Sequence, residues 1–228
     1  FLGLAGGGEA FVQVLDGVTG RSWYYRFDLT DFDAKDDRID VRVGPNRFSP
    51  QGITLDLPAV DGAGALRGSL SYSAFHPWPV TWLKPGVMGP FAWAPFMECY
   101  HGVCGLDHRV DGTLELDGAT LRFDDGRGYC EKDWGRAFPK AYVWMQGNSF
   151  ETRGVSFMGS IAHIPWLGTS FPGFLGGLRL ADGTLVPFAT YTGASTKRLA
   201  VDDAHEHRVL ADRRRTLTIR AERARGGL

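Results

Sequence analysis

Apolar residues recur at every second position along this chain, which limits it to a fold built from half-buried β-strands. The alternating sets are Trp23, Tyr25, Phe27 and Leu29; Ile39, Val41 and Val43; Ile53, Leu55 and Leu57; and Leu66, Leu70 and Tyr72. No window between residues 9 and 195 repeats apolar residues at intervals of three and four over three turns, so we expect little helix. Residues 200–215 form the only weak helical candidate. The 31 glycines, 12 prolines and 15 phenylalanines agree with an all-β chain, because turns use the first two and sheets favour aromatic residues.

Two Asp-Gly pairs mark the tightest predicted turns. Type I′ turns favour Asp-Gly because both central residues have a positive φ. The first pair, Asp117-Gly118, separates apolar positions at 114–116 and 121–123, and the second, Asp182-Gly183, separates those at 178–180 and 185–191. The sequence therefore predicts two β-hairpins.

The composition excludes several classes of protein. The chain has 228 residues, a formal net charge of −1 and a 43% hydrophobic share, which are typical of a globular protein rather than a disordered one. It contains no run of about 18 uncharged apolar residues, so we expect no membrane span. The positive and negative charges nearly balance, so the composition does not indicate a nucleic-acid-binding protein. Three cysteines are an odd number and indicate a reducing compartment, by default the cytoplasm. The first residue is Phe1 rather than Met, so we expect a piece of a longer protein, truncated at one or both ends.

A segment rich in proline and tryptophan divides the chain. Residues 75–96 contain five prolines, together with Trp78, Trp82 and Trp93. We expect an irregular loop here, joining an N-terminal β half, residues 1–74, to a C-terminal β half, residues 97–228. The loop is either a lid or binding segment, or a connector whose tryptophans plug the end of a barrel.

Polar residues that can carry acid–base chemistry concentrate in two short stretches, 97–108 and 126–135. On a strand, Tyr129, Glu131 and Asp133 fall on one side, next to Trp134. If that side faces an interior cavity, loss of solvation raises the pKa of a carboxyl, which can then act as a general acid. The alternative is a surface ion pair or a turn cap. In the first stretch, Glu98 shares a face with Tyr100, and Cys99 shares the other with His101.

A third polar stretch, residues 142–150, looks covered on both faces. Trp144, Gln146 and Asn148 alternate on one of them. Buried amides need partners, so Gln146 and Asn148 either bond the backbone of the protein itself or hold a polar ligand head group.

Soft and imidazole ligands also occur within a short span, but their spacing does not predict a metal site. They are Cys99, His101, Cys104, His108 and Cys130. No C-x-x-C pair is present, so inert buried thiols are favoured over zinc and we expect no metal.

Several blocks of the chain resemble the tocopherol cyclase family, in the same order as in that family. The two most specific are Pro95-Phe96-Met97-Glu98-Cys99-Tyr100-His101-Gly102-Val103 and Gly128-Tyr129-Cys130-Glu131-Lys132-Asp133-Trp134-Gly135 with Phe138-Pro139. The others are Phe11-Val12-Gln13-Val14, Met88-Gly89-Pro90-Phe91, Trp144-Met145-Gln146-Gly147-Asn148-Ser149-Phe150, Ile164-Pro165-Trp166 and Phe188-Ala189-Thr190-Tyr191-Thr192-Gly193. Family members usually carry a further N-terminal segment with a Gly-Trp-Tyr motif and a further C-terminal strand block, and neither is visible here.

This resemblance implies an all-β, lipocalin-like architecture of two related antiparallel barrel or sandwich halves. It also implies an intramolecular lyase, an isomerase, that closes a chromanol ring on a prenylated hydroquinone without a cofactor. Such a reaction protonates the prenyl double bond and lets the phenol oxygen capture the cation. The catalytic candidates are Asp133 or Glu131 as proton donor, and His101, hydrogen-bonded to Glu98 or Tyr100, to orient or deprotonate the phenol. The substrate-binding candidates are Tyr100, Tyr129, Trp134, Trp144, Gln146, Asn148 and Tyr191.

Two other functions fit the same pattern. Lipocalin-like barrels often carry an apolar molecule without altering it, and related barrels hydrate isoprenoid double bonds. The expected partner in every case is an apolar isoprenoid, with peripheral membrane contact permitted by the loop tryptophans.

Overall fold

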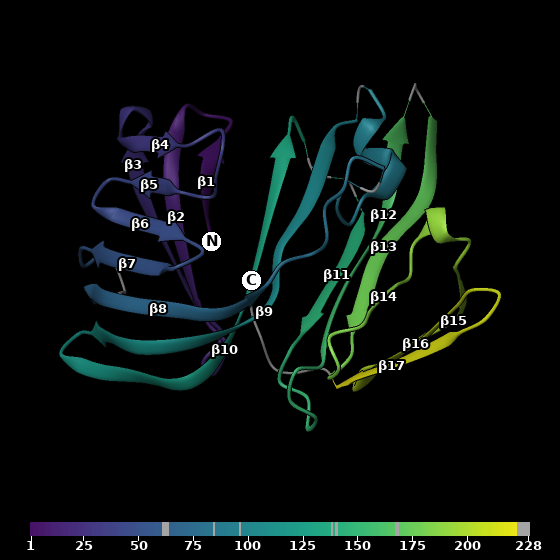
Figure 1. Cartoon of the computed structure of the whole chain (residues 1–228). Helices are drawn as coiled ribbons and strands as arrows, with labels where there is room; N and C mark the ends of the chain where they lie inside the picture. The colour runs from purple at the N-terminus through teal and green to yellow at the C-terminus, as the bar shows by residue number, and fades with distance from the viewer. Residues whose placement is uncertain are drawn as a thin grey trace. The chain divides into compact units, whose positions relative to one another are not determined.

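The computed structural model describes residues 1–60, 64–83, 85–95, 97–137, 139, 141–166 and 169–222. Every strand pairing among them is antiparallel, and the helical segments are three short 3₁₀ turns (Figure 1). The chain forms two compact units. The first contains residues 1–74 and 109–126, and the second contains residues 75–108 and the described chain from Arg127 onward.

The first unit begins with a sheet of three strands in sequential order and continues into a longer run of strands. The first sheet consists of β1 (Leu2–Ala5), β2 (Glu9–Asp16) and β3 (Arg21–Asp28). After the turn η1 (Leu29–Asp31) follow β4 (Phe32–Ala34), β5 (Val41–Val43), β6 (Asn46–Ser49), β7 (Gly52–Leu57) and β8 (Leu66–His76), each paired with the next.

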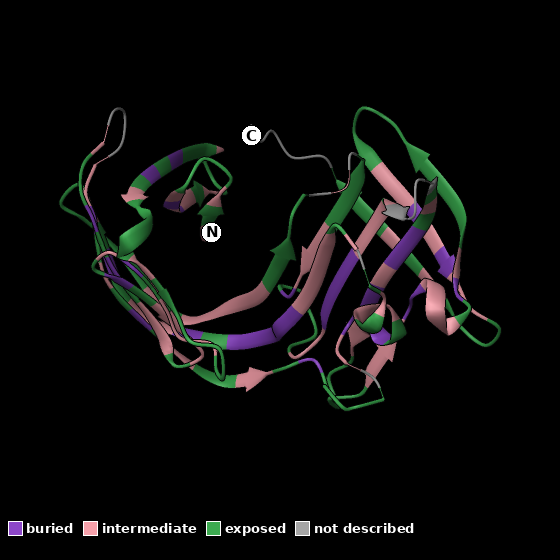
Figure 2. Ribbon diagram, turned by 90° about the horizontal axis from the view of Figure 1, so that it is seen from above, coloured by how far each residue is buried: buried purple, intermediate pink, exposed green. Residues whose placement is uncertain are grey.

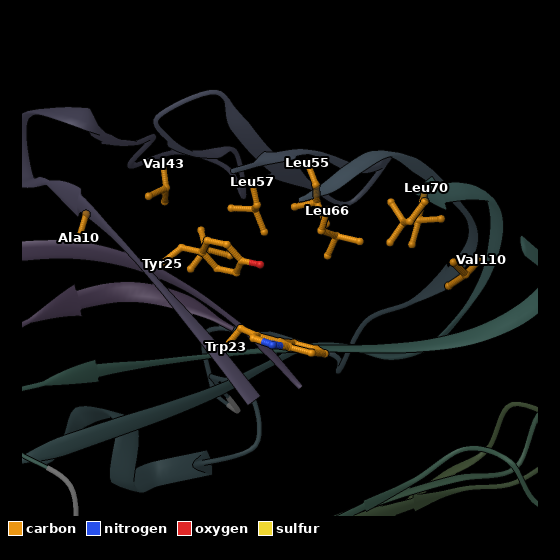
Figure 3. Packing of buried hydrophobic residues seen from close by; sticks show 11 residues of the cluster. Ala10, Trp23, Tyr25, Val43, Leu55, Leu57, Leu66, Leu70 and Val110 are labelled. Atoms are coloured by element: carbon orange, nitrogen blue, oxygen red, sulfur yellow. The ribbon is translucent and has the colours of Figure 1, made fainter. Parts of the chain in front are cut away.

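The predicted alternation fills the core of this unit. Trp23 and Tyr25 from β3 lie in one cluster with Leu55 and Leu57 from β7 and Leu70 from β8 (Figure 3). Burying each such side chain contributes roughly 1.5–3 kcal/mol, so this cluster is the main source of stability of the unit. The period-two pattern thus identified the inward face of these strands.

Two long neighbouring strands, β9 (Cys99–Leu116) and β10 (Ala119–Gly135), run through both units. Asp117 and Gly118 join them with φ values of 54° and 78°, as a type I′ turn requires, and the predicted hairpin is confirmed. The tip of this hairpin, residues 109–126, groups with the first unit, whereas the sequence analysis assigned it to the C-terminal half. Because the strands are long, residues near the turn group with the first unit and residues near the other ends of the strands group with the second.

The second unit adds two further sheets. One consists of β11 (Tyr142–Gly147), β12 (Ser156–Trp166), β13 (Thr169–Arg179) and β14 (Leu185–Pro187), and the other of β15 (Ser195–Val201), β16 (His205–Ala211) and β17 (Thr216–Glu222), after the turn η3 (Thr190–Thr192). The second predicted hairpin is confirmed, with Arg179 paired to Leu185 around Asp182-Gly183. The weak helical candidate at residues 200–215 was wrong, because this segment forms strands that pair along their length.

The segment between β8 and β9 is mostly irregular, as predicted, although its first two residues finish β8 and it contains the turn η2 (Gly89–Trp93). Trp78 is buried against Gly177 in the core of the second unit, so this tryptophan packs as a connector residue would. Trp82 and Trp93 are 82% and 64% exposed, so they plug nothing within the described chain.

The prediction of an all-β fold is confirmed, and the described sheets are open. None of the four hydrogen-bonded strand orders closes on itself among the described residues, so the sheets are not closed barrels, which is consistent with a β-sandwich fold. Burial follows the strands, and residues 103–108 in the middle of β9 form a continuous buried run (Figure 2).

Candidate functional site

One histidine lies between two carboxylates where β9 and β10 run side by side. His101 on β9 forms a hydrogen bond through Nδ1 with Asp133 Oδ1 on β10, and its Nε2 lies 3.4 Å from Glu131 Oε2. The side chains are 12% exposed for His101, 19% for Glu131 and 26% for Asp133. His101 and Glu131 are thus partly buried, whereas Asp133 as a whole residue is exposed, so a small molecule can reach the cluster from the side of Asp133.

This environment favours the charged imidazolium of His101. Burial alone lowers the pKa of His101, but the hydrogen bond and the charge of Asp133, with the charge of Glu131, raise it above the ordinary value. The imidazole thus holds a proton at a point where either carboxylate can receive it.

Glu131 also accepts hydrogen bonds from two aromatic residues. The Tyr129 hydroxyl donates to Oε2 at 2.6 Å, and Trp144 Nε1 on β11 donates to the same oxygen at 3.0 Å. Burial, the charge of Glu131 and this hydrogen bond raise the pKa of Tyr129, so its hydroxyl stays a donor. The two ring centroids lie 6.0 Å apart, so two aromatic surfaces flank the carboxylate.

Trp134 lies on the opposite face of β10 from Glu131 and Asp133, although it follows Asp133 directly in the chain. Its ring stacks on Tyr100 at 5.6 Å between centroids, and Lys132 Nζ lies 4.9 Å from its centre. Alternation along the strand explains this, since residue 134 points away from residues 131 and 133.

The predicted hydrogen bond from His101 to Glu98 or Tyr100 was also wrong, because Asp133 occupies that position. The Tyr100 hydroxyl donates to the Ala94 carbonyl instead, and Glu98 is exposed. Neighbouring strands bring together side chains that no spacing along one strand can pair.

The polar residues of the third stretch have different surroundings. Trp144 is 39% exposed, so the expectation that both faces are covered was wrong for the first half of β11, which is the edge strand of its sheet. Asn148 is buried and donates to the Gly128 carbonyl, the backbone alternative. Gln146 Nε2 is buried without a hydrogen-bond partner among the described residues, so its amide remains available to a ligand. Tyr191 donates to the Val87 carbonyl and thereby holds the loop before η2.

The same three residues are the group that can hold a metal ion. His101, Glu131 and Asp133 each offer a ligand atom, and these atoms lie within 4.8 Å of one another. His101 Nδ1 bonds Asp133 and two aromatic donors bond Glu131, while His101 Nε2 is buried without a hydrogen-bond partner among the described residues.

Comparison with known proteins places this cluster in a recognised sequence family. Residues 83–166, which contain both carboxylates, His101, Tyr129 and Trp144, match the family described as tocopherol cyclase-like. The match covers 84 of the 228 residues, so it shows a similarity of this stretch to the tocopherol cyclase-like family. The resemblance read from the sequence blocks is confirmed there.

Two plant proteins are similar to parts of this chain. It is 34% identical over 71 residues to a probable chloroplastic tocopherol cyclase of Oryza sativa subsp. japonica, and 36% identical over 56 residues to a chloroplastic tocopherol cyclase of Zea mays. The matches cover 31% and 25% of this chain, and 15% and 12% of the length of those relatives. No solved structure matches the chain significantly. No described helix is long and apolar enough to cross a membrane.

Proposed function

We propose that the chain closes a chromanol ring on a prenylated hydroquinone by protonating the prenyl double bond. The observation that carries this proposal is His101 held between Asp133 and Glu131 inside the stretch that matches the family. Ring closure moves one proton from the phenol to the alkene and leaves the formula unchanged, so it needs one acid, one base and a route between them. This cluster supplies the acid and the base, and water at the partly exposed carboxyls completes the route.

Asp133 is the proposed proton donor. When its proton passes to the alkene, a tertiary cation forms and Asp133 is left as a carboxylate. The His101 imidazolium, hydrogen-bonded to that carboxylate, stabilises it at the moment its charge develops. Of the two roles predicted for His101, orientation fits better than deprotonation of the phenol, because a histidine that already holds a proton cannot accept one.

Glu131 is the proposed acceptor of the phenol proton. As the phenol oxygen bonds to the cation, its proton moves to Glu131. Glu131 then releases that proton to water and Asp133 takes one up, since both side chains keep some solvent exposure, while His101 stays charged throughout. The site is thereby reset after each turnover.

The rings of Tyr129 and Trp144 are placed to stabilise the cation. Aromatic faces stabilise a nearby positive charge by roughly 0.5–2 kcal/mol each. Both residues contact Glu131, whereas the ring of Trp134 already lies beside Lys132. We therefore assign cation stabilisation to Tyr129 and Trp144, and propose that Gln146 contacts the polar head group.

Removing either carboxyl tests the proposal. Asp133→Asn and Glu131→Gln should each lower chromanol formation by roughly 10²–10⁴-fold while changing ligand affinity far less, because a general acid or base contributes that much. Asp124→Asn, on the same strand but exposed and paired with Arg122, is the matched control and should keep full activity. Turnover is measured by chromatography of a prenylated hydroquinone and its products. Near-normal turnover by both amides contradicts the assignment.

The same assay separates the two rival functions. A carrier returns the hydroquinone unaltered from a tight complex, and a hydratase yields a product heavier by one water. A chromanol has the mass of the substrate but a different retention time. Only the third outcome supports the cyclase.

We further propose that the protein meets its substrate at a membrane surface. A prenylated quinol partitions into lipid. The loop before η2 carries an exposed apolar tip made of Val80, Trp82 and Leu83. These side chains are 71%, 82% and 75% exposed, and an antiparallel bridge from Val80 to Pro85 closes the base of the tip. Tryptophan and aliphatic residues on a closed turn suit insertion at the lipid interface.

A further inference from the structure

Two free thiols face each other across β9 and β10. Cys104 is buried and Cys130 is partly buried. On the same face of the hairpin, Tyr100 stacks on Trp134. A Cβ atom placed on Gly102 would lie 3.4 Å from Lys132 Cγ, so Gly102 faces Lys132. Cys104 and Cys130 are the next pair in this ladder, two residues further along each strand.

The backbone geometry of such a pair suits a disulfide. Directly opposed residues on antiparallel neighbours have Cα atoms about 4.5–5.5 Å apart. A disulfide accepts Cα separations of about 4.4–6.8 Å. The bond can therefore form without moving the two strands.

The surroundings distinguish the two sulfurs. The hydrogen bond from Cys130 lowers the pKa of Cys104, and the positive charges of Lys132 and His101 act in the same direction against the effect of burial. The same hydrogen bond and burial raise the pKa of Cys130, while burial raises the pKa of Cys99 to about 11. Cys104 is thus the thiol that most readily becomes the nucleophilic thiolate.

We propose that Cys104 and Cys130 form a peroxide-reactive dithiol that oxidises to a disulfide between β9 and β10. The Cys104 thiolate attacks one oxygen of hydrogen peroxide, the O–O bond breaks, and a sulfenic acid forms with release of hydroxide, which takes up a proton to become water. The Cys130 sulfur then attacks the Cys104 sulfur and a second water leaves. In sum, two thiols and one peroxide give one disulfide and two waters.

The modification site lies directly beneath the acid–base cluster. Cys130 precedes Glu131 in the chain, and the two strands that the bond would join also carry His101 and Asp133. The inference itself does not depend on the proposed cyclase activity, because it concerns the chemistry of the thiols alone.

Mass spectrometry of peroxide-treated protein tests the inference. No lysine or arginine separates Cys99 from Cys104, so trypsin leaves both on one peptide, whereas Cys130 lies on the peptide 128–132. The experiment therefore uses Cys99→Ser, in which any cross-linked peptide identifies Cys104–Cys130. We expect this link to form within the monomer, with a loss of two hydrogens, and to disappear on reduction.

Two further variants test the order of steps. In Cys130→Ser, dimedone should trap a sulfenic acid on Cys104, at least about tenfold faster than it labels Cys99, because the thiolate is the reacting form. In Cys104→Ser, Cys130 should resist both oxidation and trapping. The inference is overturned if treated Cys99→Ser protein keeps two alkylatable thiols, or if the wild-type protein links through Cys99 instead.

Discussion

At the scale of single residues, the behaviour of the site depends on the proton held by His101. Asp133 and Glu131 lie on either side of the His101 ring, and the hydrogen bond with Asp133 and the charges of both carboxylates raise the pKa of the histidine despite its burial. A sequence can show that such residues are present. Their mutual contacts determine which of them holds the proton.

The raised pKa of His101 predicts how stability depends on pH. A group whose pKa is higher in the folded state adds stability that is complete below its unfolded pKa, about 6.5 for histidine, and is lost as the pH rises through the folded pKa. The wild-type protein should therefore lose its advantage over His101→Gln as the pH rises through that window. Urea unfolding of both proteins at several pH values measures the difference.

Asp133→Asn supplies the matched comparison for this prediction. Removing the partner that raises the pKa of His101 should move the loss of stability to lower pH. An unchanged pH dependence in this variant contradicts the role assigned to Asp133.

At the scale of elements, the β9–β10 hairpin positions the site, and its turn requires a positive φ at both central residues. Gly118 has a φ of 78°, which side chains of L-amino acids rarely adopt, while the space around its Cβ direction is open. Gly118→Ala should destabilise the protein by about 1–2 kcal/mol through backbone strain alone. Gly6→Ala, also in open space but with no positive φ, is the control and should have little effect in the same denaturant titration.

The exposed tip of the loop before η2 carries a second prediction at this scale. Replacing Trp82 and Leu83 with alanine should weaken binding to phosphatidylcholine vesicles by at least about tenfold, since each buried large apolar side chain contributes roughly 1.5–3 kcal/mol. Val18→Ser removes a valine that is 94% exposed on a turn of the first unit and should leave binding unchanged. Equal losses in a vesicle-sedimentation assay would argue against a specific docking role for the tip.

At the scale of the whole molecule, stability depends on cores that the alternating strands build within each unit. Leu57 has no exposed surface and lies in the core of the first unit. Leu57→Ala should lower the free energy of unfolding by about 2–5 kcal/mol, because it removes buried methyl groups and leaves a cavity. Leu121→Ala, at a residue that is 40% exposed, should cost much less in the same urea titration.

The sequence by itself determined the all-β fold, both Asp-Gly hairpins and the inward face of the early strands, because alternation and turn chemistry are local properties. It failed at residues 200–215, where a mixed pattern looked weakly helical and pairing between strands made it β-structure. The similarity of residues 83–166 to the tocopherol cyclase-like family could also be predicted from the sequence, since the motifs that carry it are contiguous.

Only the tertiary structure decided which residues of the site meet. Counting back from the Asp117-Gly118 turn pairs His101 with Trp134, yet the partner of His101 is Asp133, one residue earlier. A register shift of one residue reverses which side chains share a face. That shift puts the carboxylates beside the histidine, moves Trp134 to Tyr100 and brings Cys104 opposite Cys130, none of which any local pattern in the sequence encodes.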